Sequence, residues 1–271
     1  MQHGRGRGVR YSRRGREAAS ERAAPGGADS GRRVTLRSGG HEPIHPRATS
    51  FAQRAMESAA IVRIYESRLW RRSVVMRLVL GLPFEREYAL VLGAAQPGEA
   101  ADVLDLACGS GIYSRPLARA IPRGRVVGLD LSPAMLRHAR RLAARERAAN
   151  VWFARGDAQR LPFPAARFDL VNCCGALHLF PDARAALAEI ARVLRPGGCF
   201  TASVVRRRES GALARTLRAL GVASFSERDL GELLRGAGLF DLRVHHARAL
   251  WLVVSARRRA AAHRPNQEDL S

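Results

Sequence analysis

Short apolar runs alternate with amphipathic stretches between Ala101 and Ser255, and this alternation is the main structural signal in the chain. The apolar runs lie at 103–106, 125–129, 151–154, 168–171, 199–205, 239–244 and 250–255. They have the length of strands, whereas most of the segments between them repeat apolar residues at steps of three and four, as helices do. Strands that alternate with helices predict an α/β fold built on a mainly parallel sheet.

Capping residues mark where several of these helices begin. Ser132 before Pro133 is the pattern of an N-cap followed by the first helical residue, and it predicts a helix to about Ala149. Ser226 and Asp229 match the S-x-x-D form of a capping box. Local signals therefore agree with the periodicity on where the helices start.

The chain before the first strand divides into two zones. Residues 1–50 are rich in glycine and arginine without apolar periodicity, so we expect them to be disordered, and a natural start at Met56 is an alternative. Residues 51–98 show helical periodicity, with one helix from about Ala55 and another at 85–92. We expect residues 99–256 to form the core and 257–271 a polar tail.

One β-α-β unit at 101–131 contains the strongest functional signal. Its first strand enters the turn Gly109-Ser110-Gly111, and its second strand ends on Asp130, which is placed to accept hydrogen bonds from ribose hydroxyls. A dinucleotide loop would have glycine where Ser114 stands. Asp105, just ahead of the loop, suits a ligand with an ammonium and a sulfonium better than a pyrophosphate.

The composition excludes several kinds of chemistry. The net charge is +22, and all 46 basic residues are arginines, which with the abundant alanine and glycine indicates codon bias rather than a dedicated nucleic-acid surface. Without lysine, the chain has no P-loop lysine, no Schiff-base lysine and no tyrosine–lysine pair of a dehydrogenase.

The four cysteines lack C-x-x-C spacing, so we expect free thiols in the cytoplasm and no metal site. No apolar run has the length of a membrane span.

The string DLACGSG, followed by GLDLSPAMLRHAR, resembles motif I and its successor in class I S-adenosylmethionine-dependent methyltransferases. The run GDAQRLPFPAARFDLVNCCGALHLFPDARAALAEIARVLRPGGCF is most similar to the branch that contains the ubiquinone- and menaquinone-pathway C-methyltransferases. The resemblance implies a Rossmann-like seven-stranded sheet of order 3-2-1-4-5-7-6, with strand seven antiparallel and helices on both faces.

The resemblance also implies a role for each residue of the glycine loop and its neighbours. Gly109, Ser110 and Gly111 would approach the methionine portion of S-adenosylmethionine, with Asp105 near its ammonium group. Asp130 would hold the ribose hydroxyls.

Further cofactor contacts follow from the same resemblance. Leu131 and Met135 would lie against the adenine. Asp157 would accept a hydrogen bond from the adenine amino group, and the amide of Ala158 would donate one to a ring nitrogen. Asn172, at the end of the fourth strand, would contact the methionine moiety.

The acceptor side of the site is less defined. His178 follows the fourth strand and is a candidate general base because the pKa of histidine lies near neutrality. Tyr65 and Tyr88, on the helices before the sheet, are candidates for the acceptor pocket, although ordinary packing also explains all three residues.

We therefore predict a methyltransferase that acts on a small, lipophilic acceptor. Amino methylases of nucleic-acid bases carry an Asn/Asp-Pro-Pro-aromatic motif where this chain has Asn172-Cys173-Cys174-Gly175, so we expect no nucleic-acid substrate. The alternatives are a nicotinamide-dependent oxidoreductase and an RNA-binding protein that acts through its arginine-rich N-terminus.

Overall fold

The computed structural model describes residues 81–207, 212–219 and 221–260. The predictions for residues 1–50, for Tyr65 and for the helix from Ala55 lie outside these ranges, as does most of the predicted tail.

Seven strands form one sheet in the order β3-β2-β1-β4-β5-β7-β6. The strands are β1 (Asp102–Leu106), β2 (Arg125–Asp130), β3 (Val151–Arg155), β4 (Phe168–Cys174), β5 (Leu194–Val205), β6 (Leu239–Arg248) and β7 (Trp251–Arg258). The first five are parallel to one another, whereas β7 runs antiparallel to both β5 and β6. The predicted order and the antiparallel seventh strand are confirmed.

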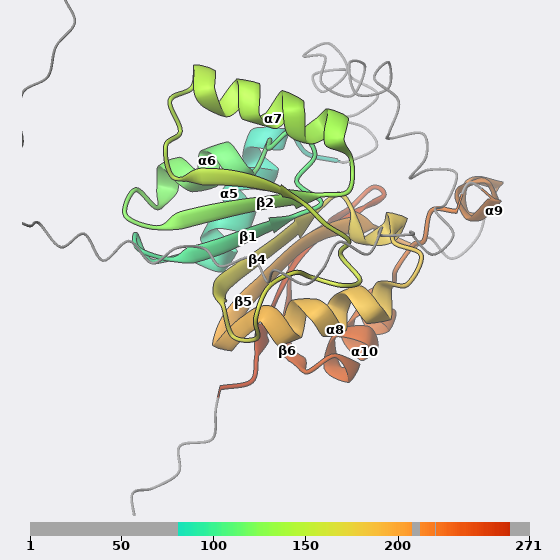
Figure 1. Cartoon of the computed structure of the whole chain (residues 1–271). Coiled ribbons are helices and arrows are strands. Elements are labelled where there is room, and N and C mark those ends of the chain that lie inside the picture. The colour runs from blue at the N-terminus through green and yellow to red at the C-terminus, as the bar shows by residue number, and fades with distance from the viewer. Residues whose placement is uncertain (1–80, 208–211, 220, 261–271) are drawn as a thin grey trace, which may run out of the picture. The chain divides into compact units, whose positions relative to one another are not determined.

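Helices cover both faces of this sheet (Figure 1). They are α5 (Phe84–Ala95), α6 (Ser114–Ala120), α7 (Pro133–Arg145), η1 (Leu177–Leu179), α8 (Ala183–Val193), α9 (Ala212–Ala219) and α10 (Glu227–Gly236). Helices α5, α6 and α7 lie on one face, and α8 and α10 lie on the other. Because both faces are covered, consecutive residues of a central strand are buried together, as Val103 and Leu104 are in β1.

The capping residues act as predicted. The Ser132 hydroxyl accepts from the Met135 amide at the start of α7, and Ser226 and Asp229 form a reciprocal capping box at the start of α10. Several boundaries were wrong: α7 ends at Arg145, β4 continues beyond Val171 and β5 begins at Leu194. Strands β6 and β7 extend to Arg248 and Arg258.

Strand β4 is longer than predicted because its polar last residues are buried and paired. Asn172, Cys173 and Cys174 pair with residues 201–203 of β5. Asn172 therefore lies inside the sheet rather than at the end of a strand. The predicted strand ends at Val171 because the polar side chain of Asn172 interrupts the apolar run.

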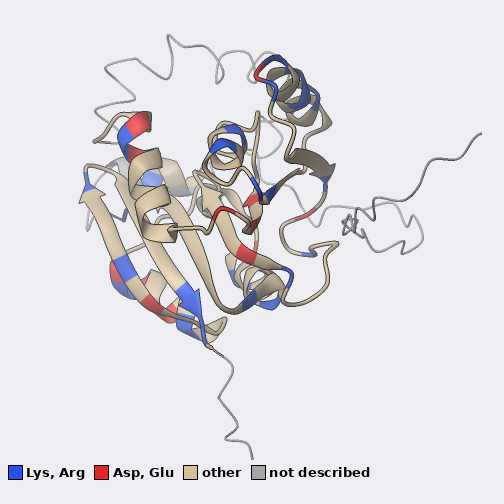
Figure 2. Ribbon diagram, turned by 90° about the vertical axis from the view of Figure 1, so that its left-hand side faces the viewer, with Lys and Arg blue, Asp and Glu red and all other residues tan. Residues whose placement is uncertain are grey.

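Charged residues are interleaved over the described part of the chain. Figure 2 shows arginine positions on helices and at strand ends, with acidic positions near many of them. Arg115 and Arg119 both pair with Glu146, for example, at 2.9 and 2.7 Å. Within the described ranges, no helix combines the length and apolarity that crossing a bilayer requires.

Candidate functional site

The loop after β1 depends on backbone conformations that favour glycine. Gly109 and Gly111 have φ values of 54° and 73°, in the left-handed region, and the Gly111 amide closes the turn by donating to the Cys108 carbonyl at 2.8 Å. Ala107, at the entry to the loop, also has a positive φ of 53°. Nothing in the apolar pattern signals that Ala107 is strained.

The two loop glycines have different surroundings. A Cβ atom on Gly111 would lie 3.0 Å from the ring of Phe153, which comes from β3 and supports the loop from behind. Among the described residues, a Cβ atom on Gly109 would meet only the Met135 sulfur, at 4.0 Å. Within this part of the chain the space over Gly109 is therefore open and bounded by Met135, which fits a ligand that approaches the backbone closely. The role of Phe153 was missed in the sequence, where it resembles any other strand aromatic.

Asp130 ties the end of β2 to the loop. One of its oxygens accepts from the Gly109 amide and the other from the Ser132 amide, each at 2.8 Å. A carboxylate has about four acceptor sites, so Asp130 can accept from a ligand in addition to these amides. Burial raises the pKa of Asp130, although backbone hydrogen bonds from Ser132, Gly109 and Leu131 oppose this.

Asp105 lies behind the loop and is 2% exposed. Its oxygens accept from the Ser114 hydroxyl at 2.5 Å and the Asn172 amide at 2.8 Å, and Thr201 in turn donates to Asn172 at 3.0 Å. Burial raises the pKa of Asp105 to about 6, against the effect of its hydrogen bonds. The structure thus gives Asp105 and Asn172 a shared buried network that links β1, β4, β5 and α6.

The remaining predicted cofactor residues lie at the ends of β2 and β3. Leu131 follows β2 and is half-buried, and Ala158 is buried after β3. Asp157 accepts from the Gln159 amide at 2.9 Å and so holds its own turn. Ser110 is buried within the loop, and its carbonyl accepts from Arg115 at 2.6 Å. The fold therefore brings these residues to the same edge of the sheet as Gly109 and Asp130.

His178 lies in η1, directly after β4, and is 6% exposed. Burial lowers its pKa to about 4, so the imidazole is neutral at neutral pH. Its ring packs against Trp251 with the centroids 5.7 Å apart.

Tyr88 lies on α5 within an aromatic cluster. Its ring centroid is 6.5 Å from that of Phe84 and 6.4 Å from that of Tyr113, and the residue is half-buried. The helix that bears it packs against β5 and β7. The cluster gives Tyr88 a packing role, and its predicted role in an acceptor pocket stays a prediction.

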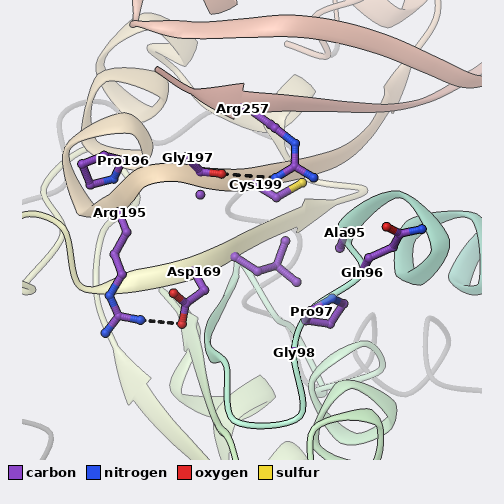
Figure 3. A pocket seen from close by; sticks show the side chains of 12 residues that line it. Ala95, Gln96, Pro97, Gly98, Asp169, Arg195, Pro196, Gly197, Cys199 and Arg257 are labelled. Atoms are coloured by element: carbon purple, nitrogen blue, oxygen red, sulfur yellow. Dashed lines mark hydrogen bonds and ion pairs between the residues drawn. The ribbon is translucent and has the colours of Figure 1, made fainter. Parts of the chain in front are cut away.

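A pocket of about 370 Å³ lies at the opposite edge of the sheet, where the parallel strands begin (Figure 3). Asp169 and Arg195 form an ion pair at 2.5 Å in its wall, and Arg257 donates to the Gly197 carbonyl at 3.2 Å. The glycine loop lies at the other end of these strands.

The methyltransferase-domain family matches residues 103–198, a range that contains the glycine loop, Asp130 and Asp157. The core of this chain is a class I S-adenosylmethionine-dependent methyltransferase domain. The family and the confirmed strand order agree with the resemblance found in the sequence.

Curated relatives match the methyltransferase domain rather than the whole chain. An uncharacterized chloroplastic methyltransferase of Arabidopsis thaliana is 36% identical over 145 residues, which are 52% of this chain and 40% of that protein. The demethylmenaquinone methyltransferase of Lactiplantibacillus plantarum is 44% identical over 99 residues, 36% of this chain and 42% of that protein. The chain thus spans half or less of the length of these relatives.

A solved structure shares the fold of the methyltransferase domain. Phosphoethanolamine N-methyltransferase 2 of Haemonchus contortus, in complex with S-adenosyl-L-methionine, superposes with a TM-score of 0.64 over 80% of this chain and 61% of that chain. The sequence identity is 17%, so this likeness concerns the fold alone.

Proposed function

We propose that this protein transfers a methyl group from S-adenosylmethionine to a small, lipophilic acceptor. The observation that carries the proposal is the arrangement of Asp130 across the open space at Gly109, within a methyltransferase domain. The match to a demethylmenaquinone methyltransferase supports a small acceptor that contains a ring system.

Each residue at this edge has a binding role in the proposal. Asp130 would accept hydrogen bonds from the ribose hydroxyls, and the left-handed turn at Gly109 would admit the methionine portion. Leu131 and Met135 would flank the adenine, with Asp157 and the Ala158 amide at its edge.

Asp105 acts indirectly in this proposal. Asp105 is 2% exposed and its oxygens accept from Ser114 and Asn172, so it would hold the loop in shape rather than contact the ligand ammonium. Its charge when ionised would still favour a cationic ligand across the loop.

The chemistry needs little from the protein besides positioning. When bound, S-adenosylmethionine supplies a methyl carbon that is already activated by a positive sulfur. The chain has to align the acceptor for in-line attack, exclude water and remove a proton from a weak nucleophile. His178 is unprotonated at neutral pH and stays the candidate base, but burial lowers its pKa to about 4 and so weakens it as a base.

Binding of S-adenosylhomocysteine, measured by calorimetry beside NAD and NADP, tests the proposal. We expect S-adenosylhomocysteine alone to bind, and nicotinamide binding without it would show that the oxidoreductase alternative is correct. In Asp130→Asn, loss of charge-assisted hydrogen bonds should cost about 1.5–3 kcal/mol, or about tenfold to over a hundredfold in Kd. Asp169→Asn, the same change at the opposite edge, is the matched control and should leave Kd unchanged.

We also propose that the enzyme works in the cytoplasm, supported by its four cysteines, all of which are free thiols. Cell fractionation with an antibody to the protein tests this proposal. Recovery with an organelle fraction would contradict it.

A further inference from the structure

Two polar side chains that are distant in the sequence meet at the carboxyl edge of the sheet. His178 lies in η1, just after β4. Trp251 is the first residue of β7, and because β7 is antiparallel to β5, it pairs with Val205 at the carboxyl end of β5. The two rings are 5.7 Å apart and inclined at 73°.

Both residues carry a buried polar atom that the fold does not use. The side-chain atoms Nδ1 of His178 and Nε1 of Trp251 have no hydrogen-bond partner in the described part of the chain. The residues are 6% and 8% exposed, so bulk water does not replace the missing partners. Buried polar atoms are nearly always paired, so two unpaired atoms on rings whose centroids are 5.7 Å apart point to a bound partner.

Their position relative to the glycine loop suggests what that partner is. Strand β4 pairs with β1, which leads into the loop, and β5 pairs with β4 on the far side. The ribose and adenine positions of the proposed function lie toward β2 and β3, since Asp130 ends β2. The acceptor then has to approach over β4, β5 and β7, where His178 and Trp251 lie.

We propose that His178 Nδ1 and Trp251 Nε1–H bind a hydroxyl oxygen of the methyl acceptor. A hydroxyl donates one hydrogen bond and accepts others, so it can accept from the indole N–H and donate to an unprotonated imidazole nitrogen. Trp251 belongs to a buried apolar cluster that includes Val205 and Val253, which suits a hydroxylated acceptor with an apolar body. This assignment rests on the proposed function, because it names the chemistry of that site's second substrate.

The experiment compares 2-naphthol with naphthalene as probes, using calorimetry on the full chain with and without saturating S-adenosylhomocysteine. We expect the wild-type protein to bind 2-naphthol about tenfold more tightly than naphthalene. Trp251→Phe keeps a ring but lacks the N–H, and it should lose this preference without losing S-adenosylhomocysteine binding. Trp152→Phe, on β3 and 47% exposed, is the matched control and should behave as the wild type does.

Two histidine variants sharpen the result. His178→Leu should abolish the preference, whereas His178→Asn, which retains a polar atom near the position of Nδ1, should restore part of it.

Equal binding of the two probes by the wild type, or an unchanged preference in Trp251→Phe and His178→Leu, would overturn the assignment. If those variants change only thermal stability, the pair holds an ordered water and the assignment is again wrong. Failure of the wild type to bind S-adenosylhomocysteine contradicts the proposed function instead, and the probe preference without that ligand still decides whether the pair binds an oxygen.

Discussion

The carboxylates at the two edges of the sheet have opposite environments, and Asp102 and Asp105 of β1 show this difference. Asp102, at the amino edge, pairs with Arg167 at 2.5 Å and with Arg195 at 3.1 Å. Burial alone would raise the pKa of Asp102, but these two arginines lower it below its ordinary value. Asp105, near the carboxyl edge, accepts hydrogen bonds from the neutral groups of Ser114 and Asn172, and burial raises its pKa to about 6.

Along this one strand, Asp102 takes part in ion pairs that stabilise the fold, whereas Asp105 lies at the proposed binding site. At the amino edge, ion pairs neutralise the charges and join the beginnings of β1, β4 and β5. At the carboxyl edge, Asp105 is buried without a cationic partner in the described part of the chain. Carboxylates whose pKa is raised by burial gather where a ligand is to be bound. The contrast agrees with the proposed ligand edge and does not depend on the sequence motif.

Alanine substitutions at one glycine of each edge should give the largest difference. Gly111 and Gly197 both have positive φ, at 73° and 79°, but among the described residues only Gly111 faces a close neighbour, the Phe153 ring. Gly197→Ala should lose about 1–2 kcal/mol of unfolding free energy through backbone strain. Gly111→Ala adds overpacking and should lose about 2–4 kcal/mol together with cofactor binding. Urea denaturation measures the loss of unfolding free energy, and calorimetry measures the loss of binding. Equal losses of unfolding free energy in the two variants would show that the Phe153 ring moves aside without cost.

The two aspartates of β1 should differ in pH dependence. The folded pKa of Asp105 is above its ordinary 3.8, so its contribution to stability is full below that value and is lost as the pH rises through about 6. Asp105→Asn removes this titration. Its free energy of unfolding relative to that of the wild type should therefore rise by roughly 1–3 kcal/mol between pH 4.5 and 7.5.

The contribution of Asp102 to stability depends on pH in the opposite direction. Its folded pKa is lowered, so its contribution is present above 3.8 and is lost only as the pH falls through the folded value. Asp102→Asn should be less stable than the wild type by a constant amount between pH 4.5 and 7.5. Urea denaturation at several pH values measures both variants, and parallel curves for the two would contradict the contrast between the edges.

The smallest effect concerns two alanines in left-handed conformations. Ala107 enters the glycine loop, and Ala166 precedes β4 at the amino edge, with φ values of 53° and 52°. Replacing either with glycine relieves strain at some cost in chain entropy, so each should gain about 0.5–1 kcal/mol in thermal denaturation. Only Ala107→Gly should alter the Kd of S-adenosylhomocysteine, and an equal change from Ala166→Gly would remove the functional distinction.

The features that the sequence predicted are local ones. The β-α-β unit, its glycine turn at 109–111, and the caps at Ser132 and Ser226 are each encoded within a few residues. Strand order followed from the family resemblance, because apolar periodicity alone does not state which strands pair.

The features that it did not predict depend on residues far apart in the chain. Phe153 supports Gly111 only because β3 pairs with β2, and Trp251 reaches His178 only because β7 is antiparallel. The length of β4 was underestimated for the same reason, since Asn172 is satisfied by partners on β1 and β5. Long-range pairing gives these residues environments that no local pattern describes.

The insertion of β7 between β5 and β6 has a consequence for synthesis of the protein. All of β5 from Cys199 to Val205 pairs with β7, whose residues are made more than forty positions later, after α10 and β6. Until Arg258 has left the ribosome, an almost wholly buried strand keeps one edge open to other chains. The nascent chain is therefore most exposed to misassembly just before its sheet is complete, and a ribosome that stalls between β6 and β7 should release an insoluble product.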